Sequence, residues 1–111
     1  IAGIAKNSND CLDKASTTVD MRACLVKELK NLNVQLNLTY KELRKELPSE
    51  GQNELKKAQK AWVQFRETEC DFSAFSEQPG SIVPLIINSC YIDMTKERIK
   101  QLNDYITQNK N

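Results

Sequence analysis

Apolar residues recur at steps of three and four along one stretch of this chain, and the pattern stops at Pro48. The members of this seam are Leu25, Leu29, Leu32, Leu36, Tyr40, Leu43 and Leu47. This period places them on one face of an α-helix, whereas a half-buried strand would show a period of two. Thr17 or Thr18 can cap the start, and Asp20 suits the first turn because the helix dipole favours an acid there. We predict a helix over residues 18–47.

A second amphipathic segment follows a tight turn at residues 48–51. Its apolar stripe contains Leu55, Ala58, Trp62, Phe65, Glu69 and Phe72. The spacing predicts a helix over residues 52–76, and the short connection makes the two helices antiparallel neighbours. Aromatic residues at helical spacing usually belong to a core. We therefore expect Trp62, Phe65, Phe72 and Phe75 to be buried.

The last third of the chain predicts two shorter helices. Gln78-Pro79-Gly80 ends the second helix, and Ser81 can cap a helix over 81–92 that is apolar almost all round. Such a segment is expected inside the bundle. Thr95 can begin a final helix over 95–108. Together with a helical turn near Cys11, these segments predict an all-α, small antiparallel bundle of about four helices. We expect disorder over residues 1–9 and a single domain over residues 10–109, since 111 residues are too few for two cores.

Composition excludes several classes of function. Lysine and arginine number 16 against 15 aspartates and glutamates, so the net charge of +1 provides no global field for nucleic acid or an anionic membrane. The chain has no histidine, the commonest general base and metal ligand. No apolar stretch is long enough to span a membrane. We expect a protein that is not an enzyme and has no catalytic residues, metal or cofactor.

Motifs along the chain resemble one family. They are Asp10-Cys11, residues 15–21, Cys24, Glu28, Leu36-Asn37-x-x-Tyr40, Ala58-Gln59-x-Ala61-Trp62-x-x-Phe65-Arg66-Glu67-x-Glu69-Cys70, Gly80-Ser81-Ile82-x-Pro84-Leu85, Cys90 and Thr95-x-Glu97-Arg98. This string, over about residues 10–106, resembles the LprI-type family of secreted bacterial proteins, named for a lysozyme-inhibiting lipoprotein. The resemblance implies a small helical domain with paired cysteines and a lysozyme or other peptidoglycan hydrolase as partner. It also implies export to the periplasm or cell surface, and for such a periplasmic or extracellular protein we expect that a signal peptide has been removed.

Two features depart from the family pattern. The family often has Gly-Gly-Ser where this chain has Pro79-Gly80-Ser81, a difference that bears on the geometry of this loop. The start of the sequence given has no lipoprotein cysteine, so membrane anchoring does not follow from the resemblance.

The four cysteines favour two disulfides. An even number in so small a chain suits an oxidising compartment, and the alternative is four buried thiols of an intracellular protein. Cys11 with Cys24 and Cys70 with Cys90 would each close a short loop. The other two pairings stay open, because antiparallel packing gathers all four cysteines at one end.

Four charged residues lie on or beside the apolar faces, namely Glu28, Arg66, Glu69 and Arg98. A buried carboxylate needs a partner, and the planar fork of arginine can bond two carboxylates at once. We predict one partly buried ion network that fixes the register of the helices. The alternative is a carboxylate pair for acid–base chemistry. It is less favoured, because opposite charges lower carboxylate pKa values.

Charge is distributed unevenly along the predicted hairpin. Residues 61–95 contain five acids and only one base, whereas residues 41–60 carry a net charge of +2. Lysozymes are basic, so an acidic end could be steered to one. We predict a partner-binding site formed by Glu67, Asp71, Glu77, Gly80 and Ser81. The alternative is an ordinary solvated surface.

Three functions fit these observations. The first is a secreted or periplasmic inhibitor of lysozyme or a related cell-wall hydrolase, acting by protein–protein binding as a monomer. The second is an immunity protein against a toxin delivered by a rival bacterium. The third is a structural or envelope-stress module without an enzyme target. The resemblance favours the first.

Overall fold

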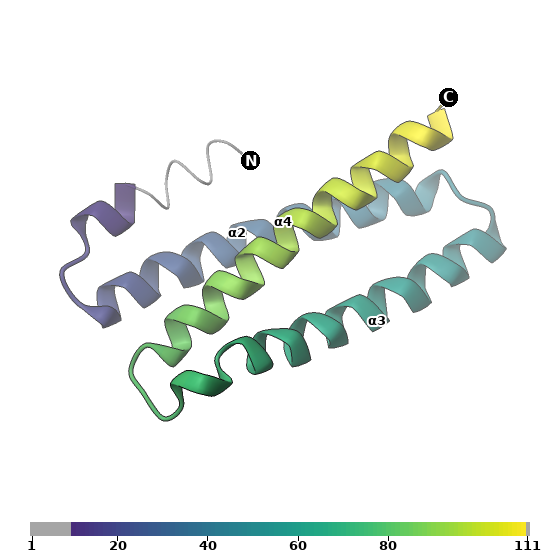
Figure 1. Cartoon of the computed structure of the whole chain (residues 1–111). Coiled ribbons are helices and arrows are strands. Elements are labelled where there is room, and N and C mark those ends of the chain that lie inside the picture. The colour runs from purple at the N-terminus through teal and green to yellow at the C-terminus, as the bar shows by residue number, and fades with distance from the viewer. Residues whose placement is uncertain (1–9, 111) are drawn as a thin grey trace.

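Three long helices dominate the computed structural model, which describes residues 10–110 (Figure 1). They are α2 (Thr18–Lys45), α3 (Ser49–Ser73) and α4 (Val83–Lys110), with the short 3₁₀ helix η1 (Phe75–Glu77) between α3 and α4. Residues 10–14 form a short helical segment before α2. The all-α fold class is confirmed. The disorder predicted for residues 1–9 lies outside the described residues.

The ends of α2 are defined by side-chain hydrogen bonds. Thr17 Oγ1 accepts from the backbone N–H of Asp20 at 3.0 Å, so Thr17 is the N-cap, one of the two threonines that the sequence offered for this role. At the other end, Gln52 Nε2 donates to the carbonyl oxygens of Arg44 at 3.0 Å and Leu47 at 3.2 Å. The Arg44 carbonyl also accepts from the backbone N–H of Leu47 at 3.2 Å, so backbone and side-chain donors share it at the helix terminus. The same contacts tie the end of α2 to the start of α3.

The boundary predicted between helices 81–92 and 95–108 is wrong, because α4 runs without interruption through Thr95. Thr95 is fully buried, and its hydroxyl accepts a hydrogen bond from Arg66 rather than capping a helix. A threonine can serve as an N-cap or as a helix residue with a tertiary partner. Sequence alone did not distinguish these roles.

The core lies mainly between α2 and α4. These two helices run in the same direction, α3 runs antiparallel to both, and α4 packs chiefly on α2 (Figure 1). The core consists of Leu25, Leu32, Leu36, Leu43, Leu55, Ile92, Ile99, Leu102 and Ile106. α3 contacts α4 less extensively and α2 at only a few positions. The molecule measures 49 × 29 × 16 Å, so its smallest dimension is only slightly larger than the diameter of a single helix, about 10–12 Å.

The prediction of a buried aromatic stripe on α3 is wrong for all its phenylalanines. Phe65, Phe72 and Phe75 are 55%, 73% and 74% exposed, and only Trp62 is partly buried. The reason is that α3 is covered along one narrow stripe. The start of α4 also differs from expectation: residues 83–88 are half-buried rather than enclosed, and Ile82 is exposed.

Within residues 10–110, no helix combines the length and apolar character needed to cross a membrane.

Candidate functional site

Two disulfides brace one end of the bundle, in the pairing predicted from loop length. Cys11 is bonded to Cys24, with 5.8 Å between their Cα atoms, and Cys70 to Cys90, with 5.5 Å. The first fastens the segment 10–14 to α2, and the second joins α3 to α4. Because α3 packs on α4 less extensively than α2 does, the second disulfide is an important link between the end of α3 and the rest of the molecule.

The four residues predicted to form one ion network do not meet. Glu28 is buried, and its Oε1 lies 3.3 Å from Lys96 Nζ on α4, an ion pair without hydrogen-bond geometry. Glu69 is exposed. Arg66 and Arg98 bond neutral groups instead of Glu28. The prediction of a single network is therefore corrected, because it assumed that α2 and α3 pack closely along their lengths. In the structure α4 supplies the partner of Glu28.

Arg66 makes contacts with all three long helices. Its Nη1 donates to Asn33 Oδ1 on α2 at 3.1 Å and to Thr95 Oγ1 on α4 at 2.9 Å. Its guanidinium carbon lies 5.0 Å from the ring centres of both Trp62 and Tyr91. Burial lowers the pKa of Arg66, partly offset by Tyr91 and Glu67. The side chain remains a cation, which two aromatic faces stabilise.

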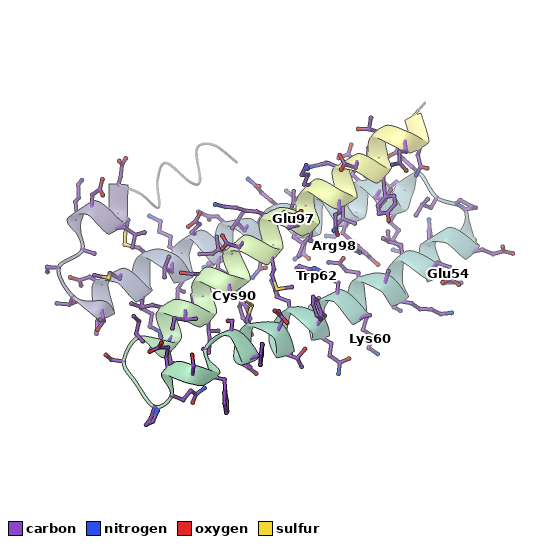
Figure 2. All side chains as sticks on the ribbon, in the orientation of Figure 1. Glu54, Lys60, Trp62, Cys90, Glu97 and Arg98 are labelled. Atoms are coloured by element: carbon purple, nitrogen blue, oxygen red, sulfur yellow. A yellow bond between two sulfur atoms is a disulfide. The ribbon has the colours of Figure 1, made fainter. Side chains whose placement is uncertain are left out.

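Arg98 extends this arrangement along α4. Its Nε donates to Gln59 Oε1 on α3 at 3.0 Å, and its Nη1 donates to Gln101 Oε1 at 3.1 Å. Its guanidinium carbon lies 5.9 Å from the ring centre of Trp62. Figure 2 shows Trp62 on α3 and Arg98 on α4 near the middle of the bundle. Burial lowers the pKa of Arg98 as well.

We call Trp62, Arg66, Tyr91 and Arg98 the arginine–aromatic stack. Both arginines, Arg66 and Arg98, were predicted from the sequence to be buried in part, but with carboxylates as their partners. The four-residue spacing between Trp62 and Arg66 was a signal for their contact, because such residues are neighbours on a helix surface. Tyr91 offered no comparable signal. The arrangement has hydrogen bonds and cation–aromatic contacts that join helices, and its contacts suit architecture better than proton transfer.

The five predicted partner-binding residues are all exposed, at the disulfide-braced end. Glu67 and Asp71 lie on α3 near Tyr91. Burial raises the pKa of Tyr91, these two carboxylates raise it further, and Arg66 lowers it. Glu77 ends η1, and Gly80 and Ser81 follow in the loop. A Cβ atom on Gly80 would lie 2.9 Å from the Glu77 carbonyl oxygen, so the loop requires glycine at this position.

The chain is similar to known proteins over most of its length. Residues 10–102 match the model of a family described as "Lysozyme inhibitor LprI". The chain is 24% identical over 115 aligned residues to "Uncharacterized protein R02472" of Rhizobium meliloti (strain 1021), covering 92% of this chain and 82% of that protein. It is 31% identical over 115 residues to "Uncharacterized protein YecT" of Escherichia coli (strain K12), covering 86% and 71%. No solved structure matches the chain. The matched family range contains both disulfides and the whole arginine–aromatic stack.

Proposed function

Because the chain belongs to the LprI lysozyme-inhibitor family, we propose that it is a non-catalytic protein that binds and blocks a lysozyme or a related cell-wall hydrolase. Family membership carries this proposal. The chemistry of the chain agrees with it: there is no histidine, and the half-buried Arg66 and Arg98 contact neutral groups and aromatic rings.

The acidic end supplies the physical basis for recognition. Glu67, Asp71 and Glu77 are exposed there, whereas the opposite end of the hairpin, residues 41–60, carries a net positive charge. A basic enzyme would approach the acidic end first, since complementary charge raises the association rate. The Cys70–Cys90 disulfide holds α3, which carries Glu67 and Asp71, against α4, so little ordering is needed on binding.

The two disulfides also support a site of action outside the reducing cytoplasm. Disulfides persist in the periplasm and the cell exterior, where peptidoglycan hydrolases act. We therefore propose that the protein meets its target in one of these compartments, as a monomer. An immunity protein against a delivered toxin would need the same kind of stable surface. The two functions differ in the enzyme that is inhibited: a lysozyme in the first case and a bacterial toxin in the second.

A turbidity assay tests the proposal. The rate at which a basic c-type lysozyme clears a suspension of bacterial cell walls is measured with increasing amounts of the protein. We expect inhibition that saturates near one molecule of protein per molecule of enzyme. The matched control is the same protein after reduction and alkylation, which should inhibit less. Full lysozyme activity at saturating protein, with no complex detectable by calorimetry, would contradict the proposal.

A further inference from the structure

Four large apolar side chains are exposed along the last turns of α3, in η1 and directly before α4. Phe65, Phe72, Phe75 and Ile82 are 55%, 73%, 74% and 48% exposed, and we call them the phenylalanine face. Phe65 and Phe72 are seven residues apart and so share one side of α3, while Phe75 follows in η1. Single exposed apolar residues are ordinary, but a gathering of large ones marks a surface that binds something.

A shallow hollow of about 420 Å³ adjoins this face. Its wall includes Ser73, Ile82, Leu85, Ile86, Ser89 and Asp93. Ser73 directly follows Phe72, and Ile82 belongs to both the face and the hollow. The Cys70–Cys90 disulfide joins the two helices beside it, so the hollow is present before any partner arrives. A preformed apolar depression beside aromatic side chains can accept a side chain from another protein.

Carboxylates surround these apolar groups. Glu69 lies between Phe65 and Phe72 on the helix, Glu77 lies two residues after Phe75, and Asp93 lines the hollow. Across residues 61–95 the single base is Arg66, which turns inward to Asn33 and Thr95. The face is therefore apolar at its centre and acidic at its edge.

We propose that the phenylalanine face is the surface through which this chain holds a basic protein partner. Phe65 and Phe72 are the apolar anchors, and Glu69, Glu77 and Asp93 form an acidic rim. This inference rests on the proposed function and adds to it the contact surface and the charge of the partner. Interfaces have this composition, with aromatic residues at the centre, where most binding energy resides, and polar groups around them.

The acidic rim also decides between occupants. In a symmetric dimer the same patch of both copies forms the interface. The acidic rim of Glu69, Glu77 and Asp93 would therefore lie against the acidic rim of the second copy. Like charges brought together at an interface are unfavourable. An anionic lipid surface would repel the rim for the same reason. A basic protein has the complementary charge.

The test compares two double variants of the full chain. Phe65→Ser with Phe72→Ser removes both anchors, and Val26→Ser with Val34→Ser removes two exposed apolar residues of α2, which are 46% and 54% exposed. Because all four side chains are exposed, we expect both variants to fold and to melt like the parent. Binding to a basic c-type lysozyme is measured by calorimetry. The phenylalanine variant should bind at least about tenfold more weakly, and the valine variant should bind as the parent does.

Hydrogen exchange gives a second measurement that needs no variant. In the complex, amides over residues 65–76 should exchange more slowly than in the free chain. Amides of α2 around the exposed Val26 and Val34 should exchange at unchanged rates. Slower exchange confined to α2 would overturn the inference.

The remaining outcomes are also decisive. If the parent binds lysozyme and the phenylalanine variant binds equally well, this inference fails and the proposed function stands. If the parent does not bind at all, both fail. If light scattering finds a dimer of the parent that the phenylalanine variant lacks, the face joins two copies and the inference is overturned.

Discussion

The guanidinium of Arg66 lies 5.0 Å from the ring of Trp62, one helical turn earlier on α3, and the same distance from the ring of Tyr91 on α4. Because α3 is covered along only one stripe, this contact and the Cys70–Cys90 disulfide are central to holding α3 in place. The contact is thus architectural.

Replacing Arg66 with alanine should lower the free energy of unfolding by about 2–3 kcal/mol. The variant loses two charge-assisted hydrogen bonds and two cation–aromatic contacts, and it leaves the buried Thr95 hydroxyl without this donor. Arg66→Lys should lie between the parent and the alanine variant, because an ammonium lacks the planar fork. Denaturant unfolding measures both. An alanine variant as stable as the parent would show that the stack does not support α3.

Replacing Lys96 with alanine should destabilise the protein by about 1–3 kcal/mol. The substitution removes the partner of the Glu28 carboxylate, and an unpaired charge is costly at this buried position. The loss is smaller than the roughly 3–5 kcal/mol of a fully buried pair, because Lys96 is a third exposed. Adding Glu28→Gln to this variant should recover part of the stability, since it removes the unpaired charge. A double-mutant cycle measures the coupling, and additive effects would show that the two residues do not interact.

Tyr91 should lose its proton at higher pH than an ordinary tyrosine. Its folded-state pKa is raised above the ordinary tyrosine value of 10.0 by burial and by Glu67 and Asp71. Its contribution to stability is therefore complete below about pH 10 and is lost as the pH rises through the folded pKa. Titration of tyrosinate absorbance should reveal one late group that Tyr91→Phe removes. Glu67→Gln should lower that pKa, and an unchanged titration would rule out the influence of Glu67.

Reversing the acidic end should slow association with a basic lysozyme. The triple change Glu67→Lys, Asp71→Lys and Glu77→Lys should lower the association rate on the order of tenfold, with some loss of stability because Glu67 also favours the charged form of Arg66. Added salt should also slow the parent, because exposed charges are screened over about 8–10 Å. Stopped-flow fluorescence measures the rates.

The matched control is a second triple variant with the same change in net charge, made away from the acidic end. Glu46, Glu50 and Asp104 are exposed, and Glu46 and Glu50 flank the α2–α3 turn. Their reversal to lysine should have a smaller effect on the association rate. Equal effects of the two triples would mean that net charge matters and the position of the acids does not.

Local patterns in the sequence were sufficient for the first two long helices, and they favoured one disulfide pairing over the two others that stayed open. The leucine seam and the Thr17 cap predicted α2, because hydrophobic period and capping act within a few residues. The cysteine spacing favoured the pairing that the structure contains, since short loops are easily closed. The five proposed partner-binding residues are all exposed, as a site of contact requires.

The tertiary structure alone decided what each face touches. Periodicity identifies the apolar face of α3, but it does not show how much of that face a neighbouring helix covers. Phe65 and Phe72 are exposed because α3 contacts α4 along only one stripe. The partner of Glu28 was likewise undetermined by spacing, because it depended on α4 continuing through Thr95 and bringing Lys96 alongside α2. Burial and pairing depend on residues far apart in the chain, so the packing of whole helices determines them.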